Sequence, residues 1–440
     1  MSRLEVPDAV RRASAYPHAI VSYVDAEGYP LSVAGDFSTD PAAVSVEVGP
    51  LSAGILPASG SEVCVTFSHI RPQPGIGYDE RRYVNLWGTA TVEGGRLTLR
   101  PTRATGWDES EVPFFEYAER NVPAGRSYLD AIGAKPRLSG FWTFFLATRL
   151  PFLTATIVPV ALGGVVAARH SAFAWVPFLL ALVGGCSVHL GLNIVNDLAD
   201  DASGADAANV NPTPFSGGSR VIQYGLVSRR RMLELCIGFY ALAAAIGLYL
   251  AATRTWWLLV VGLVGFVLSV EYTAPPLKLV HRGLGEPVTA AGFGPLMAVG
   301  TYLACARQWS WEAFYISLPV GLLVALILYV NQVPDRIADG KVGKRTLIVR
   351  WSEAQAIAAY QATVLAAYLL ICIGVLAGIA PAWTLLGLLS APLAIRTLRG
   401  LREHYDSPYQ LMPAMGTNIA LHLATGLLLL LGYAIDLVLR

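Results

Sequence analysis

Long apolar runs dominate the chain after about residue 140, and they constrain its fold more than any other feature. A helix needs about 20 apolar residues to cross the hydrocarbon core of a bilayer. Inside the bilayer no water is available to hydrogen-bond the backbone. Each such run must therefore form a helix, in which its amide and carbonyl groups bond to one another. We therefore predict an all-α membrane bundle of about nine transmembrane helices, at 141–168, 172–195, 232–252, 256–272, 286–305, 312–331, 354–378, 382–396 and 415–437.

The overall composition agrees with a membrane protein and narrows the chemistry. Hydrophobic residues make up 54% of the 440 residues and charged residues only 14%, with a net charge of +1. Such a chain lacks the basic excess of nucleic-acid-binding proteins, so we expect membrane lipid and not nucleic acid around it. The five cysteines are scattered, which argues against a disulfide framework and against a zinc or iron–sulfur site.

The first 135 residues have a different pattern. Short runs of alternating polar and apolar residues, typical of β-strands, are separated by turn residues such as Gly28 and Gly94. Strands at this spacing predict a small soluble antiparallel β-barrel, closed so that no strand edge stays unpaired. The predicted chain is therefore multidomain, with a β-domain at 1–135 and a membrane domain at 136–440. No secretory signal opens the chain, so we expect the β-domain in the cytoplasm.

The loops between the predicted spans differ in positive charge, which predicts the orientation of the bundle. One set of loops carries only Arg169, Arg254 and Arg307. The other set is rich in Lys and Arg, as in the stretch 229–231 and in GKVGKR at 340–345. By the positive-inside rule we expect a multi-pass protein of the inner (cytoplasmic) membrane. Its β-domain and its acidic loops then face the cytoplasm, and its C-terminus faces outward.

Two acidic stretches follow the second and the sixth predicted spans, NDLADDASGAD at 196–206 and NQVPDRIADGKVGKRTL at 331–347. A single Asp near a helix end is usually an ordinary polar cap, but two matched stretches favour a site. Residues four apart share one helix face and lie about 6 Å apart along its axis. Residues with this spacing are Asn196 and Asp200 in the first stretch, and Asn331, Asp335 and Asp339 in the second.

Carboxylates packed this closely repel one another unless a cation compensates their charge. Magnesium combines carboxylate ligands with substrate phosphate, so we predict Mg²⁺ as the cofactor and a diphosphate as a substrate. Basic residues near the acids are candidates to bind the phosphate oxygens, although each alone also fits a residue that only orients its helix. Gly217 and Gly218 allow a close approach of the backbone. The basic candidates are Arg220, Lys278, Lys344 and Arg345.

A lipid diphosphate suits a site of this kind at a membrane edge. Ionising an allylic diphosphate needs positive charge at the leaving group and walls that exclude water from the carbocation. Aromatic faces stabilise such a cation. The aromatic candidates are Tyr224, Tyr272, Phe293 and Tyr302, although most aromatic residues of this domain pack or lie at the membrane interface.

Four stretches, in this order, resemble the UbiA superfamily of intramembrane aromatic prenyltransferases: NDLADDASGAD, YTAPPLKL, GLGEPVTAAGFGPLMAVGTY and NQVPDRIADGKVGKRTL. The resemblance covers about 140–440. It implies nine transmembrane helices around a central cavity, magnesium bound by both acidic motifs, and transfer of a polyprenyl group from its diphosphate to an aromatic acceptor. The first motif and GLGE are most similar to the menaquinone branch, which implies 1,4-dihydroxy-2-naphthoate as the acceptor.

The resemblance also implies roles for single residues. As catalytic residues that bind the metal or the diphosphate it implies Asn196, Asp200, Asp335 and Asp339, with Asp197 and Asp206 as further metal ligands. The residues expected to bind substrate are Lys278, Arg345, Arg220, Tyr272 and Lys344. The family pattern N-x-x-x-D-x-x-x-D ends here on Gly204, and the shifted set Asn193, Asp197 and Asp201 satisfies it in full, so both registers stay open. Two roles stay open for His189, as a packing residue and as a residue of the acceptor site.

The β-domain resembles the pyridoxamine-phosphate-oxidase-like, flavin-binding split barrels, through DAEGYPLSV and YVNLWGTATVE. The first lysine of the chain is Lys135, so a flavin phosphate would depend on arginines such as Arg81 and Arg82, on hydroxyls and on backbone amides. FMN binding and a purely structural β-domain both stay open.

Two other functions fit parts of the pattern. Intramembrane acids often mark ion pathways, so an ion-coupled transporter is one alternative, and a membrane-tethered flavin-binding oxidoreductase is the other. A transporter predicts acids near the bilayer midplane, whereas these acids follow the ends of predicted spans. A helical domain that only tethered an oxidoreductase to the membrane would not need two acidic stretches. The sequence therefore favours the prenyltransferase.

Overall fold

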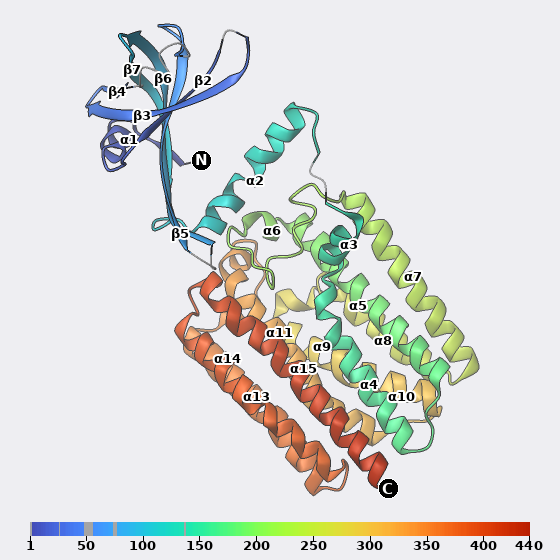
Figure 1. The fold of residues 1–440 in the computed structure, drawn as a ribbon. Coiled ribbons are helices and arrows are strands. Elements are labelled where there is room, and N and C mark those ends of the chain that lie inside the picture. The colour runs from blue at the N-terminus through green and yellow to red at the C-terminus, as the bar shows by residue number, and fades with distance from the viewer. Residues whose placement is uncertain (1, 26, 48–55, 74–76, 136–137) are drawn as a thin grey trace. The chain divides into compact units, whose positions relative to one another are not determined.

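The computed structural model describes residues 2–25, 27–47, 56–73, 77–135 and 138–440 (Figure 1). The chain forms two compact units, residues 1–125 and 126–440. The division falls inside helix α2 (Phe114–Ala131), shortly before the boundary that we expect at 135. Residue 136, where the predicted membrane domain begins, lies outside the described residues. The first unit is built from strands and the second from helices.

The first unit is a seven-stranded antiparallel sheet whose order is β1-β7-β4-β3-β2-β5-β6. β6 also pairs with β7, so strands β2 to β7 close into a ring. The elements are β1 (Ser2–Leu4), α1 (Val6–Ala13), β2 (Ala19–Val24), β3 (Pro30–Asp40), β4 (Ala43–Glu47), β5 (Glu62–Gln73), β6 (Gly77–Glu93) and β7 (Arg96–Asp108).

Alternation along the strands explains this ring, because every second side chain points inward. Val21 and Tyr23 of β2 are buried and Val24 is exposed. Val21 lies opposite Val65 of β5, and neither is exposed to solvent. The inner side chains form one hydrophobic core, which includes Phe67 and residues of α1. The burial of this core holds the ring together.

The predicted antiparallel β-domain is confirmed, but its description as a barrel is corrected. The strands form a ring of hydrogen-bonded neighbours in which β1 pairs with β7 alone among the described strands. One strand edge is therefore not closed by a second neighbour, whereas the predicted barrel has no edge. The three residues of β1 are too few to form a further full-length strand of the ring.

Seven helical segments of the second unit are long and apolar enough to cross a membrane. They make the chain a multi-pass membrane protein. The segments are Leu150–Arg169 (η2 with α4, Thr154–Arg169), α5 (Trp175–Ser203), α7 (Arg229–Thr253), Gly285–Ala306 (α9 Gly285–Ala291, η4 Gly292–Leu296, α10 Met297–Ala306), α11 (Trp311–Lys341), α13 (Glu353–Leu376) and α15 (Pro408–Leu439). Shorter elements are α3 (Gly140–Thr148), α6 (Ala205–Ala208), α8 (Trp257–Glu271), η3 (Leu279–Arg282), α12 (Leu347–Arg350), η5 (Ala382–Ser390) and α14 (Ala391–Glu403).

The expected number of about nine transmembrane helices is thus corrected to seven candidate spans in the described part of the chain. The predicted span 256–272 forms α8, which has only 15 residues. The predicted span 382–396 is divided between η5 and α14. An apolar run in the sequence shows which residues are excluded from water. It does not show where one continuous helix begins and ends.

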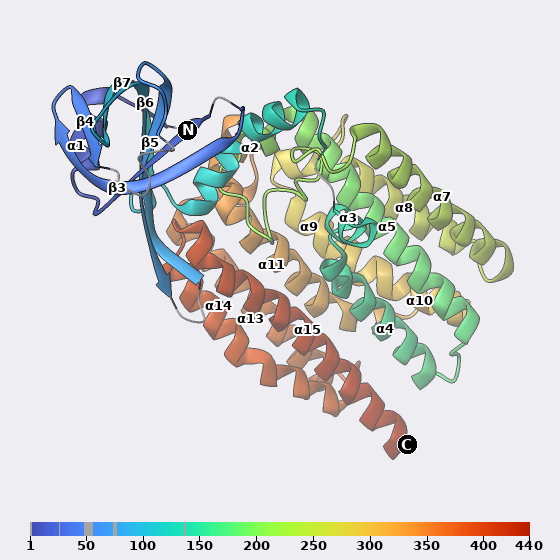
Figure 2. The same cartoon turned by 45° about the horizontal axis from the view of Figure 1, so that its top comes forward.

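Helix α11 lies at the centre of the helical unit and contacts α4, α9, α10, α13 and α15 (Figures 1 and 2). α11 has 31 residues and α5 has 29. At about 1.5 Å per residue each is more than 40 Å long, which exceeds the hydrocarbon core of about 30 Å. Each helix is therefore longer than the apolar layer is thick. The C-terminal turns of both helices carry the two acidic stretches.

Candidate active site

The C-terminal turns of α5 and α11 enclose a cavity of about 170 Å³ with a polar and an apolar side. The polar side contains four carboxylates and two cationic groups. The carbonyl end of a helix carries partial negative charge, so both helices add to the negative potential of the carboxylates. The charged lining residues are Arg149, Asp200, Asp206, Asp335, Asp339 and Lys344.

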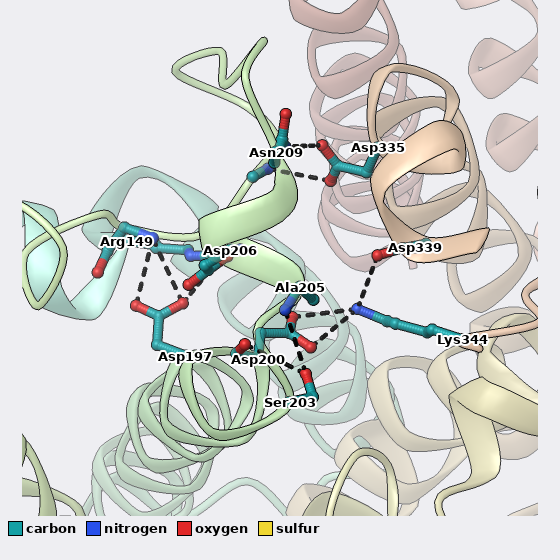
Figure 3. Close-up of polar contacts among 12 residues, drawn as sticks. Arg149, Asp197, Asp200, Ser203, Ala205, Asp206, Asn209, Asp335, Asp339 and Lys344 are labelled. Carbon is teal, nitrogen blue, oxygen red and sulfur yellow. Dashed lines mark hydrogen bonds and ion pairs between the residues drawn. The ribbon is translucent and has the colours of Figure 1, made fainter. Parts of the chain in front are cut away.

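Lys344 joins the two acidic stretches (Figure 3). Its ammonium group donates to both carboxylate oxygens of Asp200, at 3.1 and 3.0 Å. It also lies 3.5 Å from a carboxylate oxygen of Asp339. All three residues are buried. A lysine without a partner would be costly at this depth, and the two carboxylates remove most of that cost.

Asp335 is held by the loop that follows α6. One carboxylate oxygen accepts from Nδ2 of Asn209 at 2.8 Å, and the other accepts from the backbone amide of Gly217 at 3.0 Å (Figure 3). Gly217 has φ +76°, and a Cβ there would come within 2.7 Å of Nδ2 of Asn209. Only glycine combines this backbone conformation with so close an approach. The loop therefore fixes the Asp335 carboxylate before any ligand binds.

Arg149 is a site residue that the sequence analysis missed. It lines the cavity and donates to Asp197 at 2.6 Å. Asp197 also accepts from the backbone amide of Ser219 at 3.3 Å. The sequence did contain a signal, because Arg149 is an ionisable residue inside the apolar run 141–168. An arginine in such a run marks a functional position by default.

Asp206 lies on α6, outside the candidate spans, and is a buried carboxyl of the cavity lining. Burial, followed by the negative charges of Asp200 and Asp197, raises the pKa of the Asp206 carboxyl to about 9. Its carboxylate accepts from Nε2 of Gln223 at 3.1 Å. Arg220 contacts the backbone carbonyl of Asp206 and lies beside the Tyr224 ring. The cavity thus holds more carboxylates than its own cations neutralise.

The two registers of the first motif occupy different surroundings. Asp200 lines the cavity, whereas Asp201 is bound by Gln223 at 3.2 Å and by Arg229 at 3.0 Å. Asn193 and Asn196 both line the cavity. Asn193 already donates to the carbonyl of Thr148. The structure brings Asp200 to the cavity together with the second motif, whereas the partly buried Asp201 is outside the lining and pairs with Arg229.

The structure distributes the other expected residues unequally. Tyr272, Phe293 and His189 line the cavity. His189 shares a hydrogen bond of 2.8 Å with Thr156, and its ring lies edge-on to Phe293. Lys278 and Arg345 are exposed and are outside the lining. The Tyr302 hydroxyl bonds to His170 instead.

The donor set fits a divalent cation such as magnesium. Carboxylate and carboxamide oxygens are the ligands that magnesium prefers, and it usually takes one or two carboxylates and completes its shell with water and phosphate. No three His, Cys, Asp or Glu side chains of the described residues already converge into a cation site. Oδ1 of Asn331 is buried and has no hydrogen-bond partner in the described part of the chain.

A polar, acid-rich cavity that opens onto an apolar wall inside a helical membrane bundle defines a membrane enzyme for an amphipathic substrate. Residues 156–432 match the UbiA prenyltransferase family. This match spans more than half of the chain, and the chain belongs to that family. The chain is therefore a prenyltransferase, which removes the ion-coupled transporter from the alternatives. The β-domain lies outside the matched residues.

Two curated relatives illustrate the similarity. A 1,4-dihydroxy-2-naphthoate octaprenyltransferase of Bacillus subtilis is 27% identical over 289 residues, which cover 66% of this chain and 91% of that protein. A 2-carboxy-1,4-naphthoquinone phytyltransferase of Synechocystis is 29% identical over 290 residues, which cover 65% of this chain and 91% of that protein.

Solved structures of UbiA homologs are also similar to part of this chain. The apo structure of a homolog from Aeropyrum pernix is 19% identical, with a TM-score of 0.49, over 64% of this chain and 97% of that chain. A homolog from Archaeoglobus fulgidus bound to GPP and Mg²⁺ is 18% identical, with a TM-score of 0.44, over 65% of this chain and 99% of that chain.

Proposed function

We propose that the protein transfers a polyprenyl group from an allylic polyprenyl diphosphate to an aromatic quinone precursor in a magnesium-dependent reaction. One observation carries the proposal: two acidic stretches far apart in the sequence meet around Lys344 on the polar side of the cavity. The similarity to a 1,4-dihydroxy-2-naphthoate octaprenyltransferase supports 1,4-dihydroxy-2-naphthoate as the acceptor. The GLGE motif points to the same acceptor.

The residues of the cavity have different roles in the proposed reaction. Lys344 and Arg149 bind the diphosphate and stabilise its growing negative charge as the bond between the allylic carbon and oxygen breaks. Asn196, Asp200, Asp335 and Asp339 hold magnesium, with Asp197 and Asp206 beside them. When bound, magnesium supplies further positive charge to the leaving diphosphate. Tyr272 and Phe293 offer aromatic faces to the allylic cation. Apolar wall residues such as Val324 and Ile327 exclude water from it.

Gln332, which lines the cavity, and Glu286, which is outside the lining, have polar groups that lack protein partners among the described residues. Both carboxamide atoms of Gln332, which lines the cavity, are buried and unbonded among the described residues. The same holds for both carboxylate oxygens of Glu286 on α9. Glu286 and Gln332 lie close to one another without reaching hydrogen-bond geometry. We propose that these groups bind a hydroxyl of the aromatic acceptor and that Glu286 receives its proton.

Glu286→Gln is therefore expected to lower kcat of prenyl transfer by about 100-fold, because general-base catalysis typically contributes this much or more. The affinity for the prenyl diphosphate is expected to change little. Steady-state kinetics and donor binding to the purified variant measure the two effects separately. Glu234→Gln, at an exposed residue paired with Arg230, is the matched control. A wild-type kcat in the Glu286 variant would remove Glu286 from the mechanism.

A direct experiment tests the proposed function. The purified protein is incubated with magnesium, a series of polyprenyl diphosphates and a panel of naphthoic and phenolic acceptors, and mass spectrometry identifies the products. We expect a prenylated aromatic product that disappears when magnesium is chelated. A correctly folded protein that binds the donor but forms no prenylated aromatic product would overturn the proposal.

The location and the β-domain complete the proposal. The basic loops support the inner membrane as the location, with the β-domain and the acidic motifs on the cytoplasmic side.

FMN in the β-domain stays a prediction. Arg81 is paired with Glu109 and stacks on Phe114, whereas Arg82 lines a cavity of about 310 Å³ with Tyr16 and Trp107. Flavin absorption by the purified full-length protein would support binding there. Colourless protein that takes up no added FMN would indicate that the β-domain has a purely structural role.

A further inference from the structure

Three arginines form a row on α14. Arg396, Arg399 and Arg402 follow one another at intervals of three residues, so they lie on one side of the helix and span about 9 Å of its length. All three side chains are exposed. In the described part of the chain, none of the three guanidinium groups has a hydrogen-bond, ion-pair or aromatic partner. We name these three residues the α14 arginine row.

The side of α14 that carries this row faces away from the rest of the bundle. The buried residues Ala394, Thr397 and Leu401 lie on the opposite side of the helix, which packs mainly on α15 (Figures 1 and 2). Ile395, on the same side as the arginines, is 59% exposed, and Leu389 near the end of η5 is 66% exposed. Along η5 and α14 the exposed side chains thus change from leucine and isoleucine to arginine. Such a change is typical of the border between the hydrocarbon and the headgroups of a membrane.

Contacts with α11 show at which end of the bundle the row lies. Just after α14, the backbone carbonyl of Tyr405 accepts from Arg336 at 3.4 Å, and Asp406 forms an ion pair with the same arginine. Arg336 directly follows Asp335 of the second acidic stretch. The row therefore lies at the end of the bundle that holds the acidic stretches. The acid of α14 itself, Glu403, is exposed and forms no ion pair with the row among the described residues.

Positive charge at this end of the bundle also orients the membrane spans. That role depends on the number of Lys and Arg residues and requires neither a shared helix side nor free guanidinium groups. The three arginines that begin α7 show the difference. Arg229 pairs with Asp201, and both Arg230 and Arg231 pair with Glu234. Both sets add positive charge to the same end, but of the two only the α14 arginine row leaves its guanidinium groups open to an external anion.

We infer that the α14 arginine row binds the headgroup phosphate of an anionic phospholipid, whose acyl chains lie along Ile395 and Leu389. A guanidinium group presents paired N–H donors that match two oxygens of a phosphate. A phospholipid brings this phosphate and apolar chains to the same place, whereas a soluble anion brings the charge alone. A choline headgroup would add a positive charge beside three others, so an anionic lipid is preferred. The row is outside the lining of the active-site cavity, and the inference does not depend on the proposed function.

Lipid binding to the full-length protein in detergent tests the inference. The protein is titrated with dioleoyl phosphatidylglycerol or with dioleoyl phosphatidylcholine, which has the same chains, and native mass spectrometry gives the dissociation constant of the first bound lipid. We expect the wild type to prefer phosphatidylglycerol. The double variant Arg399→Gln/Arg402→Gln is expected to bind it about 25-fold more weakly, because each basic residue near an anionic lipid contributes about fivefold.

Arg230→Gln/Arg231→Gln is the matched control. It removes the same charge at the same end of the bundle, but from residues that pair with Glu234, and it should bind phosphatidylglycerol as the wild type does. Equal affinity of the wild type for the two lipids would overturn the inference. So would an equal loss in both double variants, which would show a general effect of net charge.

A crosslinking experiment locates the lipid. A phosphatidylglycerol with a photoreactive group on one acyl chain is crosslinked to the wild-type protein, and mass spectrometry identifies the labelled residues. We expect label on η5 and α14 that excess unlabelled phosphatidylglycerol removes. Glycerol 3-phosphate, which has the phosphate but no chains, should leave the label in place. Label confined to other helices would overturn the inference, and label removed equally by glycerol 3-phosphate would show a site for a free phosphate instead of a lipid.

Discussion

Asp335→Asn is expected to reduce prenyl transfer by at least about 100-fold, since losing a metal ligand or its orientation commonly costs tenfold to a hundredfold or more. The change preserves size but removes the negative charge that holds the cation. It also places an amide group where Asn209 and the Gly217 amide now donate hydrogen bonds to carboxylate oxygens. Both the charge and the fixed orientation are therefore lost in one substitution.

Transfer rates measured across a magnesium titration test this prediction. Excess magnesium is expected to restore part of the activity, because a weakened site fills at higher concentration. Asp201→Asn is the matched control, since Asp201 contacts Gln223 and Arg229 outside the cavity. Asp200→Asn should behave like Asp335→Asn. A strong loss in the Asp201 variant with an active Asp200 variant would instead support the shifted register. Full activity of the Asp335 variant at limiting magnesium would contradict the metal-binding role.

Lys344→Gln is expected to have the second large effect, on both stability and donor binding. The substitution leaves the buried carboxylates of Asp200 and Asp339 without their cation. Removing one partner of a buried ion pair typically costs about 3–5 kcal/mol, because the remaining charge stays in a poorly solvated environment. A lower unfolding temperature and weaker binding of the prenyl diphosphate should appear together.

Thermal unfolding of the purified protein, with and without magnesium, measures the stability effect. Magnesium should recover more stability in the variant than in the wild type, because a cation replaces the lost ammonium. Arg345→Gln is the matched control at the next residue, which is exposed. Sequence analysis predicts that Arg345 and Lys278 also hold the diphosphate. An equally large loss of donor binding in Arg345→Gln would support that prediction, whereas a loss confined to Lys344→Gln would favour Lys344 alone.

The sequence by itself determined the class of each unit. Alternating polar and apolar residues predicted strands in the first unit, and long apolar runs predicted membrane helices in the second, because these patterns follow from where side chains point. The spacing of Asn196 and Asp200, and of Asp335 and Asp339, predicted a cation site. Those residues lie on single helices, so their relative positions depend only on local helical geometry. Family membership follows from the same motifs.

Tertiary structure alone decided which charged groups meet. Arg149 and Asp197 are 48 residues apart in the chain, and Lys344 and Asp200 are 144 residues apart. Nothing in local spacing selects Lys344 over its exposed neighbour Arg345. The choice depends on the turn after α11, which directs the Lys344 ammonium between two buried carboxylates, where a charge is stable only with partners. The surroundings of each glycine are also decided by tertiary structure. A Cβ at Gly163 of α4 would come within 2.2 Å of the Ala298 carbonyl, whereas a Cβ at Gly247 of α7 would meet no atom within 4 Å. The two glycines are identical as residues, and only the neighbouring helices make this difference.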